Sequence, residues 1–291
     1  MNANLDYPGI MPSAKQQTAT MVWQKKWAKN TWLMRLRCPE LAKQIAPGQF
    51  FMIRDPETND PLLGRPFALL DTYEESGQTT GIDFGYVVVG KLTEIMAEWE
   101  APQRVEIWGP LGNGFPTPPS GTLTIVAGGI GQTPFFAVAR ETLGIFRYGD
   151  GSRKTETKSE NVTICYGSRS KDYLAGVEEF RAIPGLELHL ATDDGSEGYH
   201  GFVTDLFSEL CERDGNPDAV YTCGPEPMMH IVGKMCLKKN IPCWLSLETP
   251  MACGIGACFS CVTRIKMSDG GWDYRRTCVE GPVFSAEMLV F

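Results

Sequence analysis

The sequence lacks an apolar run long enough to cross a bilayer. Its most apolar stretch, residues 123–139, is broken by three glycines and by Pro134, whereas a membrane-spanning helix needs about 20 consecutive apolar residues. The first 20 residues are polar and contain no apolar segment of the kind that directs secretion. We therefore expect a soluble, cytoplasmic protein with no membrane partner.

Basic residues are also in short supply. The 27 Lys and Arg residues are outnumbered by 35 Asp and Glu residues, which gives a formal net charge of -8 with histidine neutral. This balance disfavours nucleic acid as a partner. Histidine occurs three times, and none of the three lies in a recognisable catalytic setting. The sequence therefore offers no candidate catalytic residue.

Cysteine, in contrast, is abundant, with ten residues. In a reduced compartment thiols serve metal binding or packing more often than disulfides. Cys253, Cys258, Cys261 and Cys278 form a C-x4-C-x2-C motif with a distant fourth cysteine, which is the ligand spacing of a plant-type [2Fe-2S] cluster. Gly and Ala between the first three would let the backbone approach such a cluster closely. The pattern favours electron transfer.

Other interpretations of these cysteines remain open. A structural zinc site usually takes two paired motifs, and only Cys258 and Cys261 are spaced as such a pair. A disulfide or inert buried thiols are further alternatives, and Cys243 lies close enough in sequence to compete with Cys278 as the fourth ligand. We favour Cys278 because the residues before it lead back toward an apolar segment, residues 279–284.

The length of 291 residues and the hydrophobic content of 43% predict two or three domains with real cores. From about residue 20 to 109, short strands alternate with turn residues, which is typical of a small antiparallel β-barrel. A helix is expected at 93–99, with Thr93 as its N-cap. The expected strands are 31–37, 49–54, 65–73, 82–89 and 104–109.

Beyond residue 121 the pattern changes to alternating strands and helices, which predicts a parallel, doubly wound sheet. The polar residues 147–160 read as a solvated loop. The expected strands are 123–127, 162–166, 186–192, 219–223 and 242–247, and the expected helices are 134–143, 174–182, 203–213 and 225–238.

We thus predict three units: a barrel at 15–117, a parallel-sheet domain at 118–246, and a cysteine module at 247–291 with little regular structure. The first strand of the second unit runs into the glycine-rich segment 128–134. A helix N-terminus there would present free amides to a phosphate. A plain strand-to-helix turn is the competing interpretation, because the segment does not have the G-x-G-x-x-G spacing.

Four segments together carry a family resemblance: RPFA at 65–68, GPLGNGF at 109–115, GGIG at 128–131 and CGPEPM at 223–228. In this order they resemble the ferredoxin-NADP reductase superfamily over nearly the whole chain. Within it, the cysteine motif and the segment GPVF at 281–284 look most like the electron-transfer subunits of B-type dihydroorotate dehydrogenases. The resemblance implies that the barrel binds FAD and that the sheet domain binds NAD.

The resemblance also implies roles for individual residues. The guanidinium of Arg65 suits the FAD pyrophosphate, and the residues after it would line the isoalloxazine edge. Two departures matter: Ala68 stands where many relatives have Ser, and Leu92 replaces the usual Gly. The implied FAD-binding residues are Arg65, Pro66, Phe67, Ala68, Tyr86, Val87, Val88, Leu92 and Thr93.

For the dinucleotide, the resemblance places Cys223 and Gly224 at the nicotinamide. Ser168, Arg169 and Lys171 could bind a 2'-phosphate, whereas Asp172, Asp193 and Asp194 oppose one; NAD is expected from the family. The implied NAD-binding residues are Gly128, Gly129, Gly131, Thr133, Cys223, Gly224, Pro225 and Met228.

No segment is left over for an organic substrate. The resemblance therefore implies a partner, an FMN-containing dihydroorotate dehydrogenase catalytic subunit in a heterotetramer, which would place the chain in pyrimidine biosynthesis. The alternatives are an electron-transfer subunit of a sulfide dehydrogenase or of a bifurcating transhydrogenase, or a non-catalytic zinc-binding interaction module.

Overall fold

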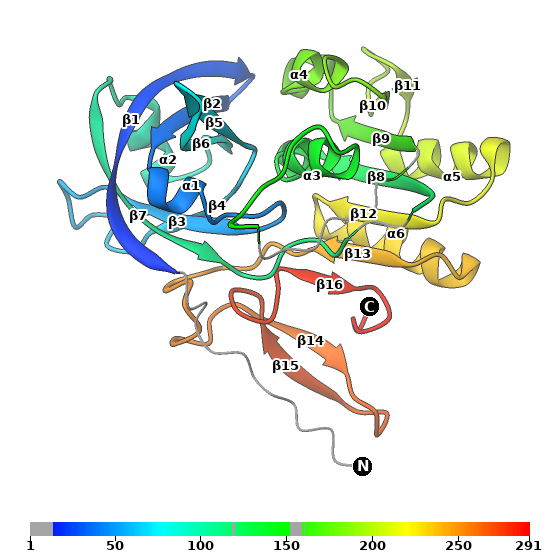
Figure 1. The fold of residues 1–291 in the computed structure, drawn as a ribbon. Coiled ribbons are helices and arrows are strands. Elements are labelled where there is room, and N and C mark those ends of the chain that lie inside the picture. The colour runs from blue at the N-terminus through cyan, green and yellow to red at the C-terminus, as the bar shows by residue number, and fades with distance from the viewer. Residues whose placement is uncertain (1–13, 118–119, 152–158, 160) are drawn as a thin grey trace.

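The computed structural model describes residues 14–117, 120–151, 159 and 161–291. Its first part is a seven-stranded antiparallel sheet, curled into a half-barrel (Figure 1). Two short helices accompany this sheet, α1 (Pro39–Ala42) and α2 (Lys91–Ala97). The strands, in spatial order, are β4 (Arg65–Ala68), β3 (Phe50–Arg54), β7 (Gln103–Leu111), β1 (Lys15–Ala28), β2 (Thr31–Arg37), β6 (Gln78–Val87) and β5 (Asp71–Glu75).

The antiparallel class of this part is confirmed, with three corrections. The predicted strand 65–73 is two strands, because the amides of Leu69 and Leu70 turn to the carbonyls of Gln49 and Asp83 on opposite sides of the sheet. The long strand β1 was not predicted, since its mixed polar sequence has no clean alternation. Thr93 is not the N-cap of α2; Gly90 is.

The second part is a seven-stranded sheet that is parallel except for its last strand. Its order is β11 (Tyr199–His200), β10 (Leu186–Thr192), β9 (Asn161–Ser168), β8 (Thr122–Gly128), β12 (Ala219–Cys223), β13 (Cys243–Ser246) and β16 (Val283–Ser285). Only β16 is antiparallel, and it pairs with β13. The predicted parallel sheet is confirmed.

Helices cover both faces of this sheet (Figure 1). On one face, α3 (Phe135–Thr142) and α4 (Val177–Arg181) pack on Ile125 and Ile164 of β8 and β9. On the other, α5 (Val203–Asp214) and α6 (Glu226–Lys239) pack on the neighbouring residues Val126 and Cys165. Successive side chains of a strand point to opposite faces, so this alternation explains why both faces are apolar.

Short 3-10 helices mark two of the loops, η1 (Gly129–Gln132) and η2 (Lys171–Tyr173). The predicted solvated loop at 147–160 is wrong at its start, because Tyr148 is buried. Residues 152–158 and 160 of that loop lie outside the described residues. Among the residues that the structure does describe, no helix is long and apolar enough to cross a membrane.

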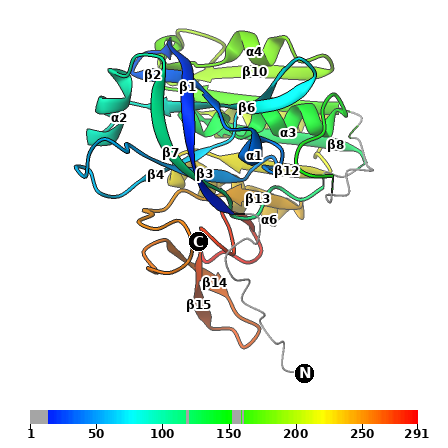
Figure 2. The same ribbon diagram turned by 60° about the vertical axis from the view of Figure 1, so that its left-hand side comes forward.

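The C-terminal part has more regular structure than the sequence suggested. Strands β14 (Val262–Lys266) and β15 (Trp272–Arg276) form an antiparallel hairpin. The hairpin projects away from both larger sheets, as the two views agree (Figures 1 and 2). The chain then returns to the parallel sheet as β16, so the cysteine segment is anchored at both ends.

Candidate functional site

The motif at 65–68 lies on β4, at the edge of the half-barrel. Arg65 is exposed, and its guanidinium donates only to the carbonyls of Leu63 and Gly64, at 2.9 and 3.0 Å. No ion pair of Arg65 is found among the described residues. This leaves donors of the guanidinium free for an anionic ligand and speaks against a surface ion pair as its role. Pro66, Phe67 and Ala68 are half-buried behind it.

Two of the predicted flavin-binding side chains lie inside the barrel core. Tyr86 is 1% exposed and its hydroxyl donates to the Gln24 side chain at 2.7 Å, while Leu92 is 2% exposed. Burial raises the pKa of Tyr86, so the phenol stays protonated. These side chains shape the barrel, and a contact of either residue with a flavin would have to come from its backbone.

The turn between β6 and α2 is stabilised by the side chain of Thr93. The Thr93 hydroxyl accepts from the amides of Val89 and Gly90 at 3.0 and 3.1 Å and donates to the Gly90 carbonyl at 2.9 Å. Thr93 therefore stabilises the start of α2. Val87 and Val88 before it are half-buried.

An exposed apolar patch flanks these motifs, and sequence reasoning missed it. Leu62 and Leu63 precede β4 and are 62% and 48% exposed, and Val89 follows β6 and is 82% exposed. An ion pair between Lys91 and Asp60 brings the two segments together. Exposed apolar surface beside a free guanidinium fits a large, partly apolar anion such as FAD. In the sequence, the two consecutive leucines in a loop were the feature that could have predicted this patch.

The glycine segments of the parallel sheet lie against each other. A Cβ on Gly128 would lie 2.7 Å from Met228 and Pro225, a Cβ on Gly131 would lie 2.5 Å from the Cys223 carbonyl, and one on Gly224 would lie 2.9 Å from the Gly128 backbone. The two predicted NAD-binding motifs thus meet at the carboxyl ends of the adjacent strands β8 and β12. That is where open α/β sheets bind ligands.

Unpaired polar atoms lie at the same place. Gln132 is fully buried, and neither its amide oxygen nor its amide nitrogen has a hydrogen-bond partner among the residues that the structure describes; the same holds for the Thr222 hydroxyl beside Cys223. Buried polar groups are normally paired, so these atoms are suited to a polar ligand. The Thr133 hydroxyl is already used, because it donates to the Ile130 carbonyl at 2.8 Å.

Cys223 lies at the end of β12 and has a partner that the sequence did not indicate. Burial raises the pKa of its thiol to about 12, partly offset by a hydrogen bond with Ser246. Cys223 is therefore a neutral thiol at physiological pH. Ser246 comes from the neighbouring strand β13, and only the tertiary structure reveals the pair.

The residues relevant to the coenzyme choice come together in two joined loops. The amides of Asp193 and Asp194 donate to the carbonyls of Ser168 and Arg169, so the ends of β9 and β10 lie side by side. Asp194 accepts from the amide and hydroxyl of Ser196, and the hydroxyl bond lowers the pKa of Asp194. The carboxylate of Asp194 is thus ionised beside the joined ends of β9 and β10.

The four cysteines of the C-terminal motif form two pairs. Cys258 hydrogen-bonds with Cys253, and Cys261 with Cys278. Among the described residues, no group of three or more His, Cys, Asp or Glu side chains is arranged to hold one metal ion. A two-iron cluster with four cysteine ligands takes two thiolates per iron, and two cysteine pairs are compatible with such a cluster.

The environment of the thiols favours their charged form. Hydrogen bonds from the Ser260 hydroxyl and amide lower the pKa of Cys258 to about 6, and a bond from Cys278 lowers the pKa of Cys261 to about 6. Cys278 donates that bond, and its own pKa is raised. Thiolates are the form that binds metal.

Cys243 lies apart from these four cysteines. It lies on β13, buried in the core under α6, and hydrogen-bonds with Cys236. This placement favours Cys278 over Cys243, and the choice of the fourth ligand stays a prediction.

Backbone conformation shapes the cysteine loop. Gly254 and Gly256 have φ of 71° and 83°, and Cβ atoms there would lie 2.7 Å from Met52 and 2.6 Å from Val279. Both positions therefore require glycine. The indole of Trp108 in β7 donates to the Cys253 carbonyl at 3.0 Å, which ties the loop to the half-barrel. Cys258 is exposed, and Cys261 and Cys278 are buried.

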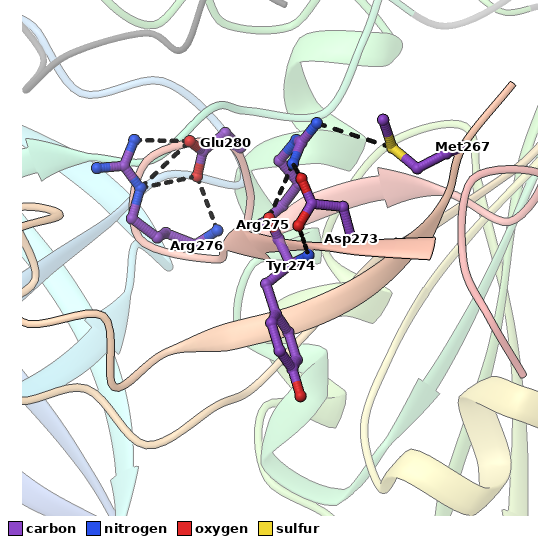
Figure 3. Close-up of polar contacts among 6 residues, drawn as sticks. All are labelled: Met267, Asp273, Tyr274, Arg275, Arg276 and Glu280. Atoms are coloured by element: carbon purple, nitrogen blue, oxygen red, sulfur yellow. Dashed lines mark hydrogen bonds and ion pairs between the residues drawn. The ribbon is translucent and has the colours of Figure 1, made fainter. Parts of the chain in front are cut away.

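A network of charged side chains backs the loop (Figure 3). Arg276 and Glu280 point toward each other, with 2.7 Å between Nη2 and Oε1. Beside them, Arg275 pairs with Asp273 at 2.8 Å, and the ring of Tyr274 points away from both ion pairs and packs edge to face on Trp272. Sequence analysis had not assigned a role to any of these residues.

Comparisons with known proteins agree with this arrangement. The iron-sulfur cluster binding domain of dihydroorotate dehydrogenase B matches residues 248–290, and the oxidoreductase NAD-binding domain matches residues 125–234. The chain is 39% identical to the dihydroorotate dehydrogenase B (NAD(+)) electron transfer subunit of Clostridium acetobutylicum, covering 85% of this chain and 87% of the relative. This chain belongs to that family of electron transfer subunits.

Other members of the family match over still more of the chain. The subunit of Enterococcus faecalis strain V583 is 36% identical over 95% of this chain and 98% of its own length. The predictions of an oxidoreductase subunit and of FAD, NAD and a [2Fe-2S] cluster as its cofactors are confirmed at the level of the family.

Solved structures share the fold. The NADH-dependent reduced ferredoxin-NADP oxidoreductase, described for flavin-based electron bifurcation, has a TM-score of 0.76 and 28% identity, covering 94% of this chain and 89% of that one. The ferredoxin reductase of carbazole 1,9a-dioxygenase has a TM-score of 0.64 at 21% identity, covering 79% and 67%. The predicted ferredoxin-reductase-like architecture is confirmed.

Proposed function

We propose that this electron transfer subunit links an FMN-containing dihydroorotate dehydrogenase catalytic subunit to NAD, within a heterotetramer. The observation that carries the proposal is the pairing of Cys253 with Cys258 and of Cys261 with Cys278, inside the segment matched by the iron-sulfur domain of dihydroorotate dehydrogenase B. Electrons would run from dihydroorotate through FMN, the cluster and FAD to NAD.

We assign FAD to the half-barrel at 15–117. Arg65 would bind its pyrophosphate, since its guanidinium is exposed and has no carboxylate partner among the described residues. Ala68 has no side-chain donor, so only backbone could bond to the flavin edge. The patch of Leu62, Leu63 and Val89 would cover apolar ligand surface. The edge of the half-barrel, with an exposed guanidinium beside exposed apolar side chains, is therefore suited to FAD.

We assign NAD to the parallel-sheet domain at 118–246. The glycine segments leave backbone uncovered at the start of η1, and the unpaired amide of Gln132 and hydroxyl of Thr222 supply polar contacts. Cys223, Gly224, Pro225 and Met228 would border the nicotinamide. Asp193 and Asp194 place negative charge where a 2'-phosphate would need cations, which favours NAD over NADP.

We assign the [2Fe-2S] cluster to the module at 247–291. When bound, a flavin exchanges a hydride with nicotinamide and releases single electrons, while an iron-sulfur cluster carries one electron at a time. The chain's own share is to hold both groups in fixed positions and to exclude water from the nicotinamide. Because Cys258 is exposed, one side of the cluster site would lie at the protein surface, where a partner could approach.

The test is anaerobic purification of the native complex, identification of the flavoprotein that co-purifies, and an assay of NADH formation from dihydroorotate and NAD, with NADP in parallel. We expect a dihydroorotate dehydrogenase carrying FMN, two copies of each subunit, and little activity with NADP. A preference for NADP would overturn the coenzyme assignment.

A second candidate rests on one observation. The bifurcating NADH-dependent reduced ferredoxin-NADP oxidoreductase matches 94% of the chain with a TM-score of 0.76. Recovery of a partner without dihydroorotate activity, but with ferredoxin-dependent reduction of a pyridine nucleotide, would favour this function and refute the first.

A further inference from the structure

Arg276 connects three parts of the cysteine module. It lies at the end of β15, two residues before Cys278. Its guanidinium donates to the Gly256 carbonyl at 3.0 Å, forms an ion pair with Glu280 at 2.7 Å, and stacks over the ring of Phe259 at 5.0 Å. One side chain therefore joins the loop that carries three cysteines to the turn that carries the fourth.

Glu280 holds the arginine in place and closes that turn. Its carboxylate accepts from the Arg276 backbone amide at 2.8 Å as well as from the guanidinium, and its own amide donates to the Arg276 carbonyl at 2.9 Å (Figure 3). The side chains of Arg276 and Glu280 are 16% and 10% exposed. In such a largely buried pair, removal of one partner leaves the other charge uncompensated.

The loop that Arg276 touches has an unusual backbone. Phe259, between Cys258 and Cys261, has φ of 56° and is 62% exposed. A positive φ is a strained conformation for an aromatic residue, and it persists only where the surroundings stabilise it. The stacking of the guanidinium on Phe259 and its bond to Gly256 supply that support.

The guanidinium is also a fixed positive charge beside the thiols. Arg276 lies two residues before Cys278, and its guanidinium donates to the carbonyl of Gly256, which lies two residues before Cys258. Because a reduced cluster carries one more negative charge than an oxidised one, a nearby cation stabilises the reduced form and raises the reduction potential. Glu280, a carboxylate in the same network, offsets part of this effect.

We propose that Arg276 is the positioning residue of the cluster: it locks the loop 253–261 onto the turn of Cys278 and, with Glu280, sets the reduction potential. The inference rests on the proposed function, because it requires the cluster on Cys253, Cys258, Cys261 and Cys278. The experiment distinguishes failure of this inference from failure of the proposed function.

The experiment uses the full chain in its native complex, purified anaerobically, as wild type and as Arg276→Gln, Arg276→Lys, Glu280→Gln and Arg264→Gln. Arg264→Gln is the matched control, since Arg264 lies in the same hairpin, is exposed, and stacks on Trp272 at 4.7 Å. Iron and acid-labile sulfide per chain, the rate of iron release to a chelator, and the potential from an EPR-monitored redox titration are measured.

For Arg276→Gln we expect iron release about tenfold faster, the scale of losing an outer contact of a metal site, and a lower potential. Arg276→Lys should release iron faster but keep a potential near that of wild type. Lysine retains the positive charge, but it lacks the several N–H donors of the guanidinium. Glu280→Gln should raise the potential. Arg264→Gln should match wild type in both measurements.

Equal iron release and equal potential in Arg276→Gln and Arg264→Gln would overturn the inference while leaving the proposed function intact. Wild-type protein without iron and labile sulfide would refute the cluster assignment and the inference with it. If Arg276→Gln does not fold, Arg276→Lys and Glu280→Gln decide: a lysine variant with unchanged iron release, or an unchanged potential in Glu280→Gln, overturns the inference.

Discussion

Two glycine-containing loops, residues 128–134 and 251–261, use glycine in different ways. In the first, Gly128 and Gly131 lack positive φ and are small because another backbone segment, 223–228, packs against them, whereas Gly129 has φ of 54° and open space around it. In the second, Gly254 and Gly256 each have positive φ and also lie against side chains. Close approach and backbone conformation are thus required of different glycines in the first loop and of the same glycines in the second.

The surroundings of the two loops differ in the same sense. The first loop lies between two parallel strands and continues into α3, and most of it is buried; the second is exposed at residues 257–260 and held by single bonds from Trp108 and Arg276. A dinucleotide site needs a rigid cradle that is present before binding, whereas a cluster would bind its loop covalently through three of its four cysteine ligands. Substitutions should therefore act differently in the two places.

The largest effect is expected from Cys261→Ser. Loss of one thiolate should remove the cluster and abolish electron transfer to the partner, while NADH-driven reduction of the flavin continues because the first loop is untouched. Stopped-flow flavin spectra and the dihydroorotate assay measure the two steps separately. Cys243→Ala, which deletes a core thiol outside the cysteine pairs, is the control and should retain both. Retention of dihydroorotate-linked transfer by Cys261→Ser would contradict the assigned electron route.

Gly131→Ala should reverse that pattern. Its Cβ would lie 2.5 Å from the Cys223 carbonyl, and overpacking of this kind costs about 1–3 kcal/mol. We expect a higher KM for NADH and slower flavin reduction, with the iron content unchanged. The control is Gly90→Ala in the half-barrel, where φ is -177° and nothing lies within 4 Å of the added Cβ. Equal KM values for the two variants would show that close packing is not what the loop requires.

Asp71→Asn tests how the first loop is anchored. Asp71 of β5 binds Arg140 of α3 and the Tyr148 hydroxyl, each at 2.5 Å, which fixes the helix after the glycine loop on the half-barrel. Loss of the charged partner should destabilise the protein by about 1–3 kcal/mol and raise the KM for NADH modestly. Chemical unfolding and steady-state kinetics measure both. A free energy of unfolding equal to that of wild type would contradict the anchoring role of Asp71.

The smallest effect concerns thiol chemistry in protein stripped of iron. Because the pKa of Cys223 is raised to about 12 and that of Cys258 is lowered to about 6, Cys258 should be alkylated at pH 7 and Cys223 should not. Lowering the pH below about 6 protonates Cys258 and should slow its reaction, whereas Cys223 should react only as the pH approaches 12. Mass spectrometry after iodoacetamide treatment reports each site; rapid labelling of Cys223 at pH 7 would contradict the raised pKa of its thiol.

The sequence predicted the second part of the chain better than the first. Strand β12 and the parallel order followed from apolar runs and intervening helices, because a strand buried on both faces leaves a continuous apolar signature. In the half-barrel, β1 has a mixed polar sequence, and the strand predicted at 65–73 divides where Leu69 and Leu70 bond to different neighbours. Local pattern does not contain that information.

For the site, the sequence by itself predicted the chemistry: four cysteines at cluster spacing, glycines where a ligand would approach the backbone, and an arginine in a flavin-type motif. Spacing is a property of the chain, so it can be read without a fold. Only the tertiary structure decided which thiols pair, that Cys243 belongs to the core, that Tyr86 and Leu92 point inward, and that Arg276 reaches Gly256. These outcomes depend on contacts between residues far apart in sequence, and such contacts exist only once the chain is packed.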